Sequence, residues 1–240
     1  MKEFYHKWYA QHLGRDFEML VFGAEGLPIV LFPTALGRYY ETKDFGLIDS
    51  VKDFINNGKI RIYCPDTIDD ESWLNFNIDP AERVQQQIIY ENLILKDVIG
   101  FAKYENNFEK IGIAGCDLGA YHAANTAFKH PEQISYLFTM GGTFDIKRFI
   151  FGHYDEESYY NNPPDYLQNL TDEFYVNEIS KMKISIGSGE FDIALEENKN
   201  LSKILNEKNF FHMFDVLPNA DHDWKWWRHM FYYFIKDLEY

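Results

Sequence analysis

The stretch Ile111-Gly112-Ile113-Ala114-Gly115-Cys116-Asp117-Leu118-Gly119 decides the fold of this 240-residue chain. An apolar, strand-like run leads directly into Gly-Cys-Asp-Leu-Gly, and helical spacing follows over 118–129. A turn this tight holds its middle residue in strained dihedrals, and glycines two residues before and after it avoid clashes with the neighbouring strand and helix. The pattern therefore predicts a sharp strand-to-helix turn that presents Asp117 at the end of a buried strand. The alternative is an ordinary turn in which Asp117 only caps the helix.

Outward from this turn, strand-like runs alternate with helical spacing in both directions. We expect strands over 6–12, 17–22, 28–32, 60–64, 111–114, 134–140, 183–186 and 211–216, and helices over 44–56, 79–101, 118–129, 194–205 and 223–238. A hairpin followed by repeated strand–helix units predicts an α/β fold with a mostly parallel sheet and helices on both faces. Ligands on such sheets bind at the carboxyl ends of the strands.

Residues 142–178 interrupt this alternation. They are rich in Tyr, Asn, Asp and Pro and show no clear periodicity. A connection of this length without regular structure is unusual in a compact domain and is often functional. We therefore expect a lid or cap insertion inside one domain that spans 1–240, a length that a single core can serve.

The composition excludes several classes of protein. A net charge of -15 argues against nucleic-acid binding, which needs clustered Lys and Arg. The N-terminus lacks an export signal and no window is apolar enough for a membrane span. Two cysteines, Cys64 and Cys116, lie in apolar runs, which favours buried thiols in a reducing compartment. We expect a soluble cytoplasmic protein with a small-molecule ligand. The 18% aromatic content leaves self-association into a homo-oligomer open.

Two polar side chains follow later strands and are candidate partners of Asp117. Asp192 ends the turn after strand 183–186, and His222 lies in the loop after strand 211–216. In this arrangement His222 can reach residue 117, with Asp192 behind it to fix the tautomer. The order nucleophile, acid, histidine is the one that α/β-hydrolases use, so we predict the α/β-hydrolase fold. The alternatives are that Asp192 caps a helix and that His222 is a polar residue at a helix start.

The remaining histidines give no sign of a metal or a cofactor. His122 lies on the helix after the turn, where packing is the preferred interpretation. The others show no spacing typical of metal ligands, and we predict neither a metal site nor a cofactor. They are His6, His12, His130, His153, His212 and His229.

Nearly the whole chain resembles the esterase family that includes esterase D and enterochelin esterase. The most specific stretches are Gly189-Glu190-Phe191-Asp192, Asn198-Lys199-Asn200-Leu201, His222-Asp223-Trp224-Lys225-Trp226-Trp227-Arg228 and Val30-Leu31-Phe32-Pro33-Thr34. In this family, backbone amides after the third strand and after the nucleophile form the oxyanion hole. The resemblance implies that Ala35 and Leu118 supply these amides here.

The chain departs from this family at the nucleophile, because Asp117 stands where family members carry serine. A carboxylate has no proton to give to histidine, and it would attack an ester only as a weak nucleophile. Beside two amides and His222 it would also favour a protonated histidine, which is a poor base. We therefore expect ester hydrolysis to be impaired or lost. A second departure is Pro33-Thr34 in place of the His-Gly of many relatives.

Three other interpretations of Asp117 stay open. Haloalkane dehalogenases and epoxide hydrolases use an aspartate nucleophile in this position to attack saturated carbon, although many of them follow it with tryptophan rather than with a residue such as Leu118. A non-catalytic binding protein on a hydrolase scaffold is the second alternative. An artificial replacement of serine is the third.

Overall fold

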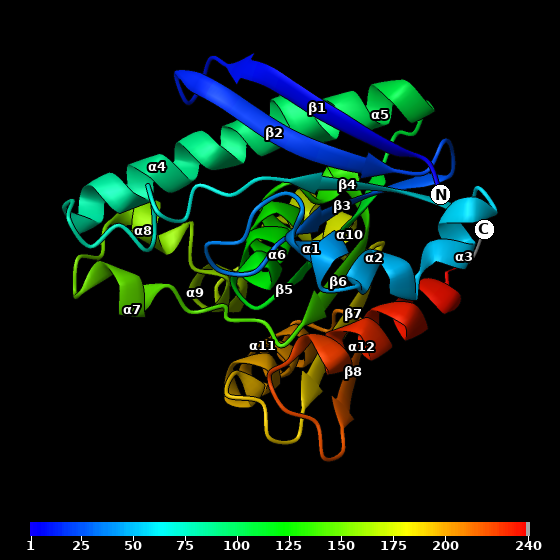
Figure 1. Ribbon diagram of the computed structural model, residues 1–240. Helices are drawn as coiled ribbons and strands as arrows, with labels where there is room; N and C mark the ends of the chain where they lie inside the picture. Colours follow the sequence, from blue (N-terminus) through cyan, green and yellow to red (C-terminus); the bar gives the residue numbers. More distant parts are fainter. Residues whose placement is uncertain (239–240) are drawn as a thin grey trace.

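The computed structural model describes residues 1–238 and is built on one eight-stranded sheet (Figure 1). Across the sheet the strands are β1 (Glu3–Ala10), β2 (Arg15–Phe22), β4 (Ile60–Pro65), β3 (Leu27–Phe32), β5 (Ile111–Cys116), β6 (Ile134–Met140), β7 (Lys183–Gly189) and β8 (His212–Leu217). The β1–β2 and β2–β4 pairs are antiparallel and all other pairs are parallel, which confirms the predicted hairpin and mostly parallel sheet.

Helices cover both faces of the sheet, as the sequence predicts (Figure 1). One face carries α4 (Pro80–Leu93), a π-helical turn (Ile94–Ile99), α5 (Gly100–Asn106), α6 (Leu118–Lys129) and α11 (Leu195–Glu207). The other face carries α2 (Leu47–Ser50), α3 (Lys52–Asn56) and α12 (Trp224–Lys236).

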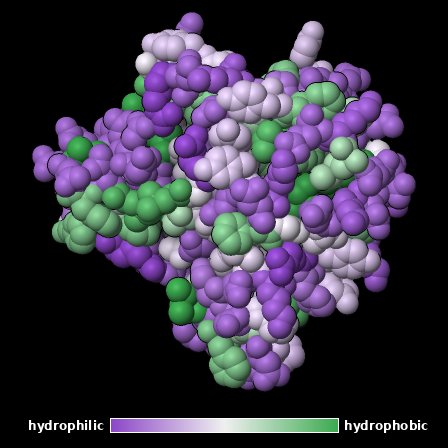
Figure 2. Space-filling model, viewed as in Figure 1, coloured by the Kyte–Doolittle hydropathy of each residue, from purple (hydrophilic) through white to green (hydrophobic). Residues whose placement is uncertain are grey.

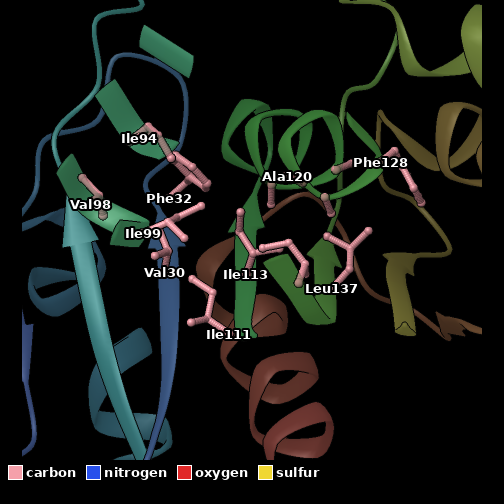
Figure 3. Packing of buried hydrophobic residues seen from close by; sticks show 14 of the residues in the cluster. Val30, Phe32, Ile94, Val98, Ile99, Ile111, Ile113, Ala120, Phe128 and Leu137 are labelled. Atoms are coloured by element: carbon pink, nitrogen blue, oxygen red, sulfur yellow. The ribbon is translucent and has the colours of Figure 1, made fainter. Parts of the chain in front are cut away.

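The central strands are apolar throughout because both of their faces are buried. In β3, Val30 and Phe32 face one helical layer while Ile29 and Leu31 face the other, and all four are fully buried. Figure 3 shows the first layer, in which strand residues pack against the π-helical turn and α6. Burying a side chain of this size stabilises the fold by about 1.5–3 kcal/mol. This packing fixes the strand ends, where the candidate site residues lie.

Two predicted helices have different bounds in the structure. The expected helix 44–56 is wrong as one element, because α1 (Glu41–Asp44), α2 and α3 replace it. Gly46 lies between α1 and α2 and interrupts the helix with a left-handed φ of 74°. The expected helix 79–101 begins as predicted, with the Asp79 amide donating to Glu82, but it continues through the π-helical turn to Asn106.

The expectation of irregular structure in 142–178 is wrong. This segment forms the short helices α7 (Lys147–Ile150), α8 (Glu156–Tyr159), α9 (Pro163–Gln168) and α10 (Glu173–Ser180). Its Tyr166 and Leu167 are buried in the main core, and the Phe144 amide donates to Glu197 of α11. Tertiary contacts therefore order helices that are too short to show a periodic pattern.

The surface is mostly hydrophilic on the face that Figure 2 shows, in keeping with the net charge of -15. Among residues 1–238, no helix combines the length and hydrophobicity that crossing a membrane requires. Cys64 and Cys116 are both free and buried, as predicted. Burial raises the pKa of the Cys64 thiol to about 12.

Candidate active site

The turn between β5 and α6 has the sharp geometry that its sequence predicts. Asp117 adopts φ 54° and ψ -123°, a strained conformation for a residue with a side chain. A Cβ on Gly115 would lie 2.1 Å from the carbonyl oxygen of Gly119, and a Cβ on Gly119 would lie 2.0 Å from that of Pro33. Both glycines are therefore required, because the backbone on either side of the turn passes too close for any side chain.

The structure brings Asp117, His222 and Asp192 together from three distant parts of the chain. His222 Nδ1 lies 2.8 Å from Asp192 Oδ1, and its Nε2 lies 3.5 Å from Asp117 Oδ1. The first distance fits a hydrogen bond, whereas the second suits an ion pair better. The Asp192 side chain is fully buried, and the other two are about one-fifth exposed. Asp192 also accepts from the Ala194 amide at 2.8 Å, so it caps the local turn as well.

Two residues that the sequence does not single out as functional, Trp227 and Gly141, lie next to His222 and Asp192. The His222 ring packs edge-on against Trp227, with ring centroids 4.8 Å apart. Gly141 approaches the same place with a φ of 57°, and a Cβ there would lie 2.7 Å from Asp192 Oδ2 and 2.8 Å from Trp227 Nε1. Only glycine leaves room for this arrangement. A glycine directly after strand β6 is the one sequence signal of this role.

The Asp117 carboxylate lies beside backbone amides at the place where the resemblance puts the oxyanion hole. The Ala35 amide donates to Asp117 Oδ2 at 3.1 Å. The neighbouring Leu118 amide also helps to lower the pKa of this carboxyl group. The loop that carries Ala35 is tied down by Thr34, whose amide donates to Glu41 at 2.9 Å. The loop therefore places the Ala35 amide beside Asp117 even though it carries Pro33-Thr34 in place of His-Gly.

Charges in the site favour an imidazolium between two carboxylates. Burial alone would lower the pKa of His222, but Asp117 and Asp192 outweigh it and raise that pKa to about 9. Burial also opposes ionisation of both acids. The interaction with His222 and the donating amides nevertheless lower the pKa of Asp117 and that of Asp192. At neutral pH the three groups form a charged triad in which His222 already holds its proton.

This arrangement predicts that stability falls in mildly alkaline solution. The folded-state pKa of His222 is raised from 6.5 to about 9. The contribution of His222 to the free energy of unfolding is therefore complete below pH 6.5 and is lost as the pH rises through 9. The shift corresponds to on the order of 3 kcal/mol. Urea denaturation at pH 6 and pH 9.5 should show this loss in the wild type, and a smaller loss in Asp117→Asn, which keeps only Asp192 beside the ring. Equal losses in the two proteins would contradict the charged triad.

Two acidic residues near the site are absent from the sequence-based candidates. Glu41 lies close enough to Asp117 for the two charges to interact, and its pKa is raised, first by burial. Asp69 follows strand β4 and pairs with His122, whose Nε2 donates to Asp69 Oδ1 at 2.9 Å. His122 is 2% exposed, as its interpretation as a packing residue predicts, but it also forms this hydrogen bond to Asp69. No local pattern marks Asp69, because its partner His122 lies far away along the chain.

No cluster of three or more His, Cys, Asp or Glu side chains that could hold a metal ion occurs among residues 1–238.

Comparison with known proteins supports the fold but gives no close sequence relative. No family model and no curated protein sequence matches the chain. Its structure is similar to that of a ferulic acid esterase, with a TM-score of 0.78 and 14% identity over 97% of this chain and 95% of the other.

Two further structures agree. A ferulic acid esterase from Anaeromyces mucronatus gives a TM-score of 0.74 and 15% identity over 98% of this chain and 90% of the other. An S-formylglutathione hydrolase from Agrobacterium tumefaciens gives a TM-score of 0.74 and 13% identity over 98% of this chain and 93% of the other. The predicted fold class is confirmed: this chain has the α/β-hydrolase fold, in the form seen in these esterases.

Proposed function

We propose that this chain is an esterase-type hydrolase in which Asp117, in place of the nucleophilic serine, has impaired or abolished ester hydrolysis. One observation carries the proposal: the Asp117 carboxylate accepts a hydrogen bond from the Ala35 amide and lies next to the Leu118 amide, which helps to lower its pKa. In a serine esterase these amides stabilise the negative oxygen that develops on the substrate. Here a side chain of the protein takes that place, and the Ala35 amide is no longer free for a substrate.

Three further chemical reasons point the same way. Serine hydrolysis needs a hydroxyl that gives its proton to a neutral histidine, and Asp117 has no such proton. The pKa of His222 is about 9, so the ring is protonated at neutral pH and cannot act as the base. Attack by the carboxylate on an ester would also yield a mixed anhydride from a weak nucleophile.

The ligand that fits this proposal is a small ester-like molecule bound at the carboxyl ends of the strands. The structural neighbours are named for activity on ferulic acid esters and on S-formylglutathione. The net charge of -15 speaks against nucleic acid as a partner. A non-catalytic binding role for such ligands follows if hydrolysis is lost completely. The test is to compare hydrolysis of short-chain p-nitrophenyl esters by the wild type and by Asp117→Ser, with the wild type expected to be slow.

One feature of the geometry favours a second candidate, an aspartate-nucleophile hydrolase that acts on saturated carbon. Asp117 Oδ2 faces the Ala35 amide, whereas Oδ1 faces His222. Oδ1 could therefore form a bond to carbon as a halide leaves, or as an epoxide carbon–oxygen bond opens. The resulting alkyl ester would place its carbonyl oxygen beside the same amide. Loss of the Asp117 charge would then lower the pKa of His222 and free it to activate water.

Intact-mass spectrometry separates the two candidates. After incubation with a haloalkane or with styrene oxide, we expect no added mass on the wild type or on His222→Ala, because our main proposal gives Asp117 no nucleophilic role. Without His222 an alkyl ester would persist, so a stable adduct at residue 117 of His222→Ala would favour the second candidate. The matched control is His222→Ala combined with Asp117→Asn, which keeps the shape of the side chain and removes its charge.

A further inference from the structure

A buried histidine–aspartate pair lies beside the candidate site without belonging to its charged triad. His122 is 2% exposed and Asp69 is 1% exposed. The imidazole is enclosed by aromatic rings, with centroid distances of 5.7 Å to Phe32, 5.1 Å to Tyr90 and 5.2 Å to Tyr121. Water has little access to a pair in such surroundings, and burying two polar groups is costly unless they are hydrogen-bonded to each other.

The pair links the two segments that carry the amides beside Asp117. His122 lies on α6, the helix that begins with Leu118, and donates from Nε2 to Asp69 Oδ1 at 2.9 Å. The other oxygen, Asp69 Oδ2, accepts from the Leu36 amide at 3.0 Å. Leu36 directly follows Ala35. One carboxylate therefore connects the helix that supplies the Leu118 amide to the loop that supplies the Ala35 amide.

The loop needs this connection because its own conformation is strained. Leu36 has a φ of 58°, in the left-handed region that residues with side chains rarely adopt. Its side chain is 56% exposed, so burial does not hold it there. Ala35 directly precedes Leu36, so a relaxed Leu36 is expected to shift the Ala35 amide relative to residue 117.

We propose that Asp69 and His122 are positioning residues that hold the two amides of the oxyanion hole in one arrangement. This role rests on the proposed function only in treating the Ala35 and Leu118 amides as an oxyanion hole. Loss of the pair would then resemble the loss of one oxyanion-hole donor, which costs about 10²–10³-fold in kcat. KM should change little, because both side chains are almost fully buried and leave little surface for a ligand.

The first test uses ester hydrolysis in the Asp117→Ser background. His122→Phe should lower kcat about 10²–10³-fold, and His122→Gln, which keeps an N–H donor, should recover part of the loss. The matched control is His130→Phe. It removes a similar pair at the other end of α6, where His130 Nε2 lies 2.8 Å from Glu91, and kcat should stay within a factor of about three.

The second test needs no enzymatic activity. In the otherwise unchanged chain, the ¹H–¹⁵N shifts of the Ala35 and Leu36 amides should move strongly in His122→Phe and hardly at all in His130→Phe. If His122→Phe does not fold, Asp69→Leu replaces it, because this side chain is of similar size and can accept neither from the Leu36 amide nor from His122. Unmoved Ala35 and Leu36 amides would overturn the proposal. If Asp117→Ser is inactive, the proposed function fails, yet the amide shifts still decide the role of the pair.

Discussion

An Asp117→Ser variant is expected to hydrolyse short-chain p-nitrophenyl esters roughly 10²–10⁴-fold faster than the wild type, the range that a positioned general base contributes. The replacement supplies the missing hydroxyl next to His222, whose Nε2 lies 3.5 Å from the present carboxylate. It also removes one of the two charges that raise the pKa of His222, so more of the ring is neutral at pH 7. Finally, it frees the Ala35 and Leu118 amides for the carbonyl oxygen of the substrate.

Two control variants separate these contributions. Asp117→Ala frees the amides without supplying a nucleophile, and it should remain far below Asp117→Ser. Asp117→Ser combined with His222→Ala keeps the hydroxyl but lacks the base, and it should lose most of the gain. Measurement of kcat/KM for the four proteins at pH 7 to 8 is sufficient. A wild type that is already as fast as Asp117→Ser would refute the main proposal.

The largest loss of stability is expected from Gly119→Ala. The new Cβ would lie 2.0 Å from the carbonyl oxygen of Pro33 and 2.9 Å from that of Phe32. Both obstacles are backbone atoms, so no side chain can rotate out of the way. Either the end of β3 or the start of α6 must shift. We expect the free energy of unfolding to fall by about 3 kcal/mol or more, at or beyond the upper end of typical overpacking, which urea denaturation at pH 6.5 can measure.

Gly100→Ala is the matched control for that substitution. Gly100 is the first residue of α5, and its Cβ would find only the Leu95 carbonyl oxygen, at 3.7 Å. Alanine favours a helix over glycine by roughly 0.5–1 kcal/mol, so this variant should be unchanged or slightly more stable. Equal effects of the two substitutions would contradict the close approach of α6 to the loop after β3.

Much of this architecture can be predicted because its signals are local. The helix 118–129 and the strand 134–140 have the predicted bounds, since apolar spacing and glycines mark them directly. Asp192 and His222 can be found because each follows the end of a strand in a parallel sheet, and the structure places both beside Asp117.

Other features depend on contacts between distant segments and leave no local trace. Asp69 gains its partners from residues 36 and 122, and Gly141 is required only because Asp192 and Trp227 converge behind it. The helices of 142–178 are similarly too short to be stable alone, so packing against the main core, rather than periodicity, determines them. Tertiary structure supplies what the spacing of residues cannot show.

The position of the Asp117 carboxylate, in the pocket beside the Ala35 and Leu118 amides, has one further consequence. Ester hydrolysis releases a carboxylic acid, and that acid leaves with its carboxylate next to the same amides. The wild-type chain thus has the appearance of an esterase with its acid product bound, except that this product is a side chain and cannot diffuse away. Free carboxylic acids should accordingly compete poorly for this pocket, whereas Asp117→Ser should accept them.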